Sequence, residues 1–229
     1  GIGFYVIWDL WDKKCCWRKL SMHSKVVLSV SLALTAVGTA LIKMTESVTW
    51  LGAFFHSISA RTAGFSTYSI GEFSKSGLFL LMILMFIGAS PGSTGGGIKT
   101  STFFVLLQGI KVAATNYSEK AFHYAIPKDT FKKAAVITIM GISVIITGTY
   151  MMGIMEPGIS FLDILFEVTS AFGTVGLSTG ITPHLTDGSK ILSVVIMYIG
   201  RLGPLTIATL WHFSKGERVS YPEGNLNIG

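Results

Sequence analysis

A short pattern of threonine, glycine and serine occurs twice in this sequence at a fixed spacing. The pattern Thr-x-Gly-(Phe/Leu)-Ser-Thr stands at residues 62–67 and again at residues 174–179, which we call the first and second Thr-x-Gly segments. The copies lie 112 residues apart, and the same offset places the Ile-Gly pair at 87–88 on the Ile-Gly pair at 199–200. One offset that holds for two separate matches indicates an internal structural duplication.

The chemistry that these segments favour is coordination of a dehydrated cation by backbone carbonyl oxygens. Gly64 and Gly176 allow dihedral angles that other residues resist, so they suit a backbone that aims successive carbonyls at an ion. Carboxylates are absent from both segments, which favours a monovalent ion over calcium. The predicted ion site is formed mainly by backbone carbonyls of Thr62, Ala63, Gly64, Phe65, Thr174, Val175, Gly176 and Leu177.

The composition is that of an integral membrane protein. Half of the residues (50%) are hydrophobic, 13% are charged, and mean hydropathy is +0.59, which excludes an ordinary soluble domain. The formal net charge of +6 comes from basic clusters between apolar stretches. That pattern indicates cytoplasmic loops rather than a nucleic-acid-binding surface. Cys15 and Cys16 are adjacent, too close for an ordinary disulfide, and are expected to be free thiols.

Two apolar stretches position the first Thr-x-Gly segment. Residues 1–8 resemble the end of a membrane helix, and the basic cluster that follows is expected inside the cell. Residues 26–42 are long enough to span outward. Residues 45–59 are too short and too polar to span, so we predict a half-length re-entrant helix that ends at the first segment. A surface amphipathic helix is the alternative.

A glycine-rich stretch interrupts the next membrane helix. Residues 77–88 are apolar but too short to cross alone, and helix-like sequence resumes at residues 98–114. Pro91 and the glycines between these stretches predict a helix break inside the membrane. Non-helical backbone at that depth is tolerated only where it is buried in protein or lines water. We therefore predict a gate below the ion site, formed by Ser90, Pro91, Gly92, Ser93, Thr94, Gly95, Gly96, Gly97 and Arg201.

Two basic residues accompany this glycine-rich loop (residues 90–97). Arg201 falls on Ala89 in the repeat register and lies in the middle of a predicted span. A charge at the bilayer centre costs at least ~2.5 kcal/mol, so a functional role is expected. We expect Arg201 to donate hydrogen bonds to carbonyls of the loop. Lys99 is expected to extend toward the inner membrane interface.

The second half of the sequence repeats this arrangement. Residues 134–155 are expected to span outward, and residues 157–172 to form the second half-length helix, with Ser160 and Asp163 as a capping pair. Residues 191–213 are expected to span inward, which leaves the C-terminus in the cytoplasm. The predicted fold is an all-α integral membrane protein of membrane–pore-loop–membrane repeats.

One sequence pattern suggests an enzyme instead. Residues 88–92 match Gly-x-Ser-x-Gly, the nucleophile turn of serine hydrolases, with Ser90 as nucleophile. A serine hydrolase needs a histidine partner. The likeliest membrane-proximal candidates, His56 and His212, are better explained as residues at the membrane interface. An intramembrane hydrolase therefore remains an alternative, as does a non-conducting structural membrane subunit. The main interpretation is that the protein is not an enzyme, with no catalytic residues and no organic cofactor.

The sequence resembles the Ktr/Trk/HKT potassium transporters, most closely the C-terminal half of the KtrB-type membrane subunit. The resemblance rests on residues 59–65, 86–100 and 198–204, of which the glycine-rich middle stretch is the most specific. It implies potassium uptake through a pore with pseudo-fourfold symmetry and one filter glycine per repeat, here Gly64 and Gly176. The implied division is 1–24 for the end of a preceding membrane helix with a linker, 25–115 and 116–215 for two repeats, and 216–229 for a cytoplasmic tail.

The resemblance also implies partners and a location. Potassium is the implied transported ion, and sodium is an activating or coupled ion. The implied assembly is a homodimer in the lipid of the plasma membrane, on a cytosolic ring of nucleotide-binding regulatory (RCK-type) subunits. The basic inner face, with Lys111, Lys120 and Lys128, is compatible with that ring and with anionic lipid. Nucleic acid is not an expected partner.

Overall fold

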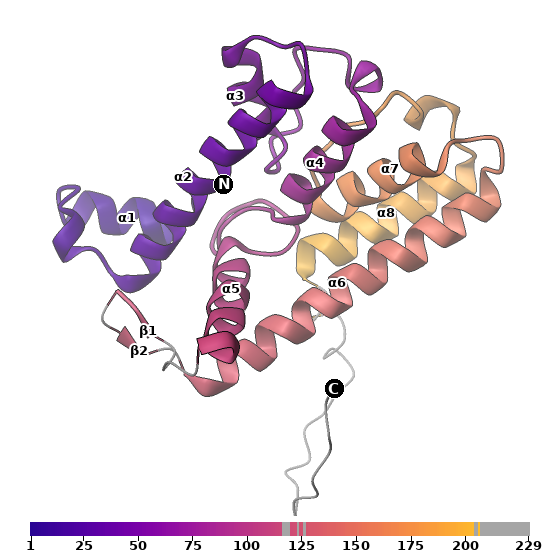
Figure 1. The fold of residues 1–229 in the computed structure, drawn as a ribbon. Helices are drawn as coiled ribbons and strands as arrows, with labels where there is room; N and C mark the ends of the chain where they lie inside the picture. The colour runs from indigo at the N-terminus through magenta and orange to yellow at the C-terminus, as the bar shows by residue number, and fades with distance from the viewer. Residues whose placement is uncertain (116–119, 123, 126, 204–205, 207–229) are drawn as a thin grey trace, which may run out of the picture.

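The computed structural model describes residues 1–115, 120–122, 124, 125, 127–203 and 206, and its helices form two successive groups (Figure 1). The first group is α1 (Phe4–Asp12), α2 (Met22–Thr45), α3 (Trp50–Ser59), α4 (Lys75–Phe86) and α5 (Thr100–Thr115). The second is α6 (Lys128–Met155), α7 (Phe161–Gly173) and α8 (Asp187–Leu202). Short connecting elements are η1 (Trp17–Lys19), η2 (Ile70–Glu72), η3 (Thr182–His184) and the antiparallel pair β1 (Lys120–Ala121) and β2 (Tyr124–Ala125).

Helices α2 and α6 are the long members of the two groups. Both are long and apolar enough to cross a membrane, with mean hydropathy of 1.9. They contain the predicted outward spans at 26–42 and 134–155. The predicted end of the last span, from 207 to 213, and the predicted tail at 216–229 lie outside the described residues.

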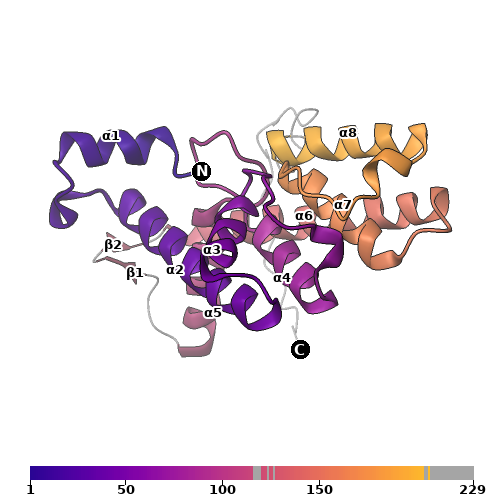
Figure 2. The same ribbon diagram turned by 90° about the horizontal axis from the view of Figure 1, so that it is seen from above.

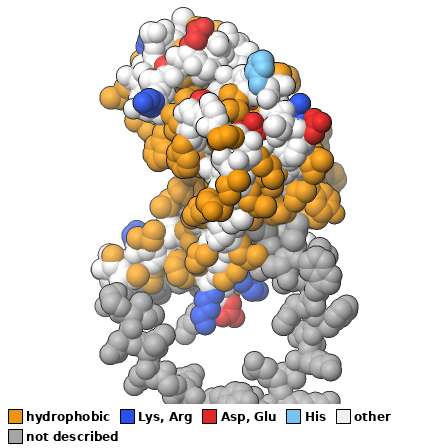
Figure 3. Space-filling view, turned by 90° about the vertical axis from the view of Figure 1, so that its right-hand side faces the viewer, with side chains coloured by type: hydrophobic (Ala, Val, Ile, Leu, Met, Phe, Trp, Pro, Cys, Tyr) orange, Lys and Arg blue, Asp and Glu red, His pale blue; other side chains and the backbone are white. Residues whose placement is uncertain are grey.

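The surface has the distribution expected of a protein that faces lipid. On the face shown in Figure 3, charged side chains gather toward the two ends and hydrophobic side chains fill the region between them. Leu32 on α2 and Ile146 on α6 are 73% and 63% exposed. Apolar side chains exposed on this scale would be a liability in water, so they indicate contact with a bilayer.

Each long helix leads into a half-length helix. Helix α3 has 10 residues and α7 has 13, against about 20 for a span. Thr49 caps α3 by accepting a hydrogen bond from the Gly52 amide at 3.1 Å. The predicted capping pair of α7 is wrong: Ser160 is the N-cap residue but its side chain makes no capping hydrogen bond. Asp163 lies in the first turn of α7, where its negative charge stabilises the helix by interacting with the helix dipole.

A glutamate clasp repeats in both halves of the chain. Glu46 follows α2, and its Oε1 accepts hydrogen bonds from the amide (3.1 Å) and hydroxyl (2.6 Å) of Ser74, the N-cap of α4. Glu156 follows α6, and its Oε1 accepts the same two bonds, both at 2.7 Å, from Thr186, the N-cap of α8. The N-cap residues Ser74 and Thr186, and with them the starts of α4 and α8, lie 112 residues apart. The duplication in the sequence therefore extends to the fold.

The helices after the clasps differ. Helix α4 stops at Phe86 after 12 residues, and α5 begins only at Thr100. Helix α8 continues for 16 residues to Leu202 and includes Arg201. The predicted helix break is therefore present in the first half. In the second half, α8 covers positions 199–202 of the equivalent stretch. Viewed from above, the non-helical stretch lies between the two groups of helices (Figure 2).

A shared core joins the two groups. Helices α4 and α7 pack together, with Leu81, Met85 and Phe166 fully buried in one apolar cluster. Val175 and Leu177 of the second Thr-x-Gly segment belong to the same cluster. The core therefore fixes the position of the second segment against the first group of helices.

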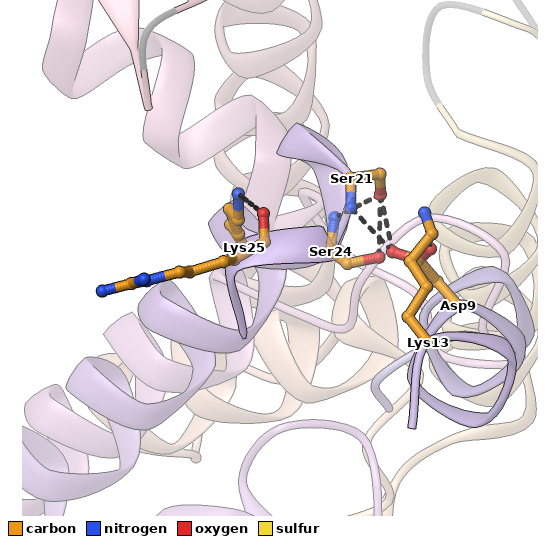
Figure 4. Close-up of polar contacts among 6 residues, drawn as sticks. Asp9, Lys13, Ser21, Ser24 and Lys25 are labelled. Atoms are coloured by element: carbon orange, nitrogen blue, oxygen red, sulfur yellow. Dashed lines mark hydrogen bonds and ion pairs between the residues drawn. The ribbon is translucent and has the colours of Figure 1, made fainter. Parts of the chain in front are cut away.

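A group of hydrogen bonds around Asp9 holds the turn between α1 and α2. Asp9 accepts hydrogen bonds from the Ser21 amide and hydroxyl, both at 2.9 Å, and pairs with Lys13 at 2.6 Å (Figure 4). Ser21 is also the N-cap of α2 and accepts from the Ser24 amide. These contacts fix the start of α2. In the first turns of α2, the Lys25 ammonium donates to the Arg18 carbonyl at 3.3 Å.

Candidate ion-coordinating site

The two Thr-x-Gly segments have the same unusual backbone. The φ angles are +72° at Thr62 and +76° at Gly64, and +48° at Thr174 and +94° at Gly176. Glycine adopts positive φ readily, but a β-branched threonine rarely does. The surrounding structure therefore imposes this conformation, as is common at functional sites.

The two segments meet in space. A Cβ atom added to Gly64 would overlap the carbonyl oxygen of Val175, and one added to Gly176 would lie 3.9 Å from the Gly64 Cα. Both glycines are at least partly accessible, whereas Val175 and Leu177 are buried. The predicted site residues of the two copies are thus brought together, although more than a hundred residues separate them.

The C-terminal ends of α3 and α7 hold the segments. The Ser59 carbonyl accepts from the amides of Ala63 (3.0 Å) and Gly64 (3.1 Å), and the Ser59 hydroxyl donates to the Phe65 carbonyl. In the second copy the Ser170 carbonyl accepts from the Val175 amide at 2.9 Å. The partly negative ends of both half-length helices therefore abut the segments, an arrangement that favours a cation there.

The glycine-rich loop touches both segments. The Gly96 amide donates to the Thr174 hydroxyl at 3.0 Å. A Cβ atom on Gly95 would collide with the Thr62 side chain, and one on Gly96 would lie 2.9 Å from the Gly173 carbonyl oxygen. Side chains are therefore excluded where the loop approaches the segments, which explains the run of glycines.

The base of the loop is closed by its own hydrogen bonds. The Ile98 amide donates to the Phe86 carbonyl at 3.0 Å, and Ile87 and Ile98 form a parallel bridge. The Thr100 hydroxyl donates to the Ser90 hydroxyl at 2.9 Å, with both residues fully buried. The loop thus leaves and re-enters the helical path at a fixed base.

Lys99, and not Arg201, bonds the loop. The Lys99 ammonium donates to the Gly95 carbonyl at 2.5 Å, so the prediction that it extends to the interface is wrong. Arg201 is exposed and makes no hydrogen bond within the described part of the chain, contrary to the predicted bonds to loop carbonyls. The reason is proximity, since Lys99 follows the loop directly and reaches back four residues. Arg201 is near enough for its charge to act on Lys99.

Two polar residues near the segments, Arg61 and Glu167, were not predicted from the sequence, and a third, His56, was predicted in the wrong place. Arg61 bonds the carbonyl and hydroxyl of Ser31 at 3.2 and 3.1 Å and ties the first segment to α2. His56, predicted at the interface, is fully buried beside the Phe73 ring at 5.4 Å. Glu167 is 7% exposed within α7 and accepts a hydrogen bond from the Thr182 hydroxyl. Their spacing in the sequence carried no signal, because their partners lie far along the chain.

The geometry does not support a hydrolase. Ser90 is buried and its hydroxyl is bonded to Thr100, with no histidine bonded to it in the described ranges. His212 lies outside those residues. Among the residues that the structure describes, no cluster of histidine, cysteine and carboxylate side chains could hold a metal ion.

Comparisons with known proteins identify a family for the chain. The TrkH family of cation transport proteins matches residues 19–217. The chain is 37% identical over its whole length to the Ktr system potassium uptake protein B of Vibrio alginolyticus, of which it covers 53%. It is 34% identical to the potassium/sodium uptake protein NtpJ of Enterococcus hirae, of which it covers 54%. The chain thus spans about half the length of these relatives.

A solved structure shares the fold. The crystal structure of the potassium transporter TrkH from Vibrio parahaemolyticus matches with a TM-score of 0.72 at 21% identity, over 92% of this chain and 49% of that one. The predicted all-α membrane fold and the predicted resemblance are confirmed, and the relatives are named as transporters rather than enzymes. The chain belongs to the TrkH family of cation transport proteins.

Proposed function

We propose that this chain supplies two ion-coordinating segments of a potassium uptake path through the plasma membrane. The observation that supports the proposal most is the contact between the two Thr-x-Gly segments, which share positive φ angles at the same threonine and glycine positions. Two relatives, of which the chain covers 53% and 54%, are named for potassium uptake or potassium/sodium uptake. Potassium is therefore the ion that we assign to the path.

In this proposal the carbonyls of residues 62–65 and 174–177 replace the water around the ion. The negative ends of α3 and α7 add attraction for the cation. The ion gradient and the membrane potential drive the flow, and no organic cofactor takes part. Sodium acts as an activating or coupled ion, in keeping with the name of the relative from Enterococcus hirae.

The glycine-rich loop is the proposed gate. Its bonds to Thr174 and Lys99 hold it against the segments in the closed state. The charges of Lys99 and Arg201 oppose a waiting cation at the same place. Opening moves residues 90–97 aside and breaks the Gly96–Thr174 bond, so that the gate and the filter are coupled directly.

The proposed assembly is a homodimer with a cytosolic ring of nucleotide-binding regulatory subunits, and the C-terminus faces the cytoplasm. Basic residues near α5 and α6, such as Lys111 and Lys132, suit a cytoplasmic face. Purification of the full-length protein from its host in mild detergent is expected to retain the ring. Its loss under all mild conditions would argue against the assembly.

Ion flux in proteoliposomes tests the proposed function. The full-length protein is expected to carry potassium down an imposed gradient, with less sodium flux under matched conditions. A folded protein that passes neither ion would instead be a structural membrane subunit. The variant Ser90→Ala is expected to keep potassium flux, because Ser90 serves the base of the loop and no hydrolytic step.

A further inference from the structure

A chain of hydrogen bonds links α7 to the second Thr-x-Gly segment. Glu167 Oε1 accepts from the Thr182 hydroxyl in η3. The Thr182 and Ser178 hydroxyls are hydrogen-bonded at 2.8 Å, and the Gly180 amide donates to Ser178 Oγ at 2.9 Å. Ser178 is the fifth residue of the Thr-x-Gly-Leu-Ser-Thr pattern. The chain of hydrogen bonds therefore runs from the half-length helix to the C-terminal end of the segment.

The first half of the chain lacks this arrangement. At the fixed offset, Glu167 corresponds to Phe55 and Thr182 to Ile70, neither of which can form these bonds. Ser66, the equivalent of Ser178, donates instead to the Tyr68 carbonyl two residues away. The carboxylate is therefore no requirement of the duplicated fold, in contrast to the clasps at Glu46 and Glu156.

Burial makes Glu167 costly to keep. The side chain is 7% exposed, and Oε2 has no hydrogen-bond partner among the described residues. A buried carboxylate without full pairing destabilises the fold relative to an apolar side chain of similar size. It borders a cavity of about 420 Å³ between α7, α8 and the second segment, which Thr174 and Ser178 also line. This destabilising residue lies beside the proposed ion site, which indicates a functional role for it.

We infer that Glu167 is a positioning residue that fixes the C-terminal end of the second Thr-x-Gly segment and thereby its discrimination between potassium and sodium. The inference rests on the proposed potassium path. The Thr182 hydroxyl donates to the buried Glu167 side-chain oxygen, and a buried acceptor that loses its donor is destabilised. Glu167 therefore holds Thr182 and Ser178, and Ser178 limits how far the carbonyls of residues 174–177 can close around a smaller ion.

The test compares variants that remove the chain of bonds with variants that keep it. Glu167→Leu and Thr182→Val delete an acceptor and a donor, whereas Glu167→Gln and Thr182→Ser retain the amide oxygen and the hydroxyl. Asp163→Asn is the matched control, because Asp163 lies one turn earlier on α7 and makes no hydrogen bond within the described residues. The readout is potassium and sodium flux of the full-length protein in proteoliposomes.

Glu167→Leu and Thr182→Val are each expected to lower the preference for potassium over sodium by roughly tenfold. The double variant should lose no more than either single one, because both act through one chain of bonds. Glu167→Gln, Thr182→Ser and Asp163→Asn should keep the wild-type preference. Thr182 is exposed, so Thr182 variants test the chain of hydrogen bonds even where Glu167→Leu fails to fold.

Three results would overturn the inference. The first is an unchanged preference in Thr182→Val and in a folded Glu167→Leu. The second is an equal loss in the retaining variants, which would indicate a general packing defect. The third is a strictly additive double variant. A wild-type protein with no potassium flux would instead refute the proposed function itself, so the two failures are distinguishable.

Discussion

The two halves of this chain share a frame but differ in what they attach to it. Both have a long helix, a half-length helix, a Thr-x-Gly segment with positive φ and a glutamate clasp. Within the described residues, a glycine-rich loop separates α4 from α5 in the first half, and a buried carboxylate lies behind the Thr-x-Gly segment in the second half. In the proposed function, the features that both halves share form the ion path, and the loop and the carboxylate act as its gate and its support.

The largest expected effect is a loss of potassium preference when either glycine of the two Thr-x-Gly segments, Gly64 or Gly176, is replaced. Both have positive φ, but a side chain on Gly64 would collide with the Val175 carbonyl, whereas the space around Gly176 is open. Gly64→Ser and Gly176→Ser should both lower potassium preference over sodium, by roughly tenfold for Gly176 and more for Gly64. Flux assays with each ion measure this. If both variants transport with the wild-type preference for potassium over sodium, the assignment of the ion site is wrong.

The next effect concerns the loop. Deleting Gly95, Gly96 and Gly97 removes the contacts with both segments, so basal potassium flux should rise several-fold and depend less on the regulatory subunit. Thr174→Val, which removes only the bond from Gly96, should raise flux less. A folded deletion variant with normal flux and regulation would reduce the loop to a simple hinge.

A smaller difference in flux is expected between variants of Lys99 and Arg201, the two basic residues of the proposed gate. Lys99→Met removes the bond to the Gly95 carbonyl and should increase basal flux. Arg201→Met removes charge alone and should change flux less, because Arg201 has no hydrogen bond in the described part of the chain. Side-by-side flux measurements decide the order. The reverse order would restore Arg201 as the residue that holds the loop.

The clasps should affect stability rather than selectivity. The bonds from the Thr186 side chain and amide lower the pKa of Glu156 below its ordinary value. A carboxyl with a lowered folded-state pKa stabilises the fold above its unfolded pKa of about 4.3, and this contribution is lost as pH falls further. Glu156→Gln should therefore lower the thermal midpoint at neutral pH and flatten its decline below about pH 4. Altered ion preference in this variant would place the clasp in the ion site.

Much of the frame was predictable because it depends on local pattern and length. Apolar runs of spanning length predicted α2 and α6, and the short polar-apolar stretches predicted α3 and α7. The density of glycine around Pro91 predicted the break after α4. The fixed offset of 112 residues predicted that the two Thr-x-Gly segments are equivalent, and their backbone angles match.

The side-chain partners were not predictable in the same way. The link between Glu167 and Thr182, and that between Arg61 and Ser31, depend on how helices pack across 15 and 30 residues. The sequence favoured Arg201 for the loop because a mid-span charge is costly, yet Lys99 is the nearer donor. His56 looked interfacial by type, but aromatic neighbours from the following loop bury it.

In the proposed function, both Thr-x-Gly segments coordinate one ion. Crystals of the full-length protein soaked in rubidium, a heavier analogue of potassium, test it through anomalous scattering. We predict a peak within carbonyl-coordination distance of residues 62–65 and 174–177 together. A protein that transports potassium but shows its rubidium peaks away from these carbonyls would contradict the account.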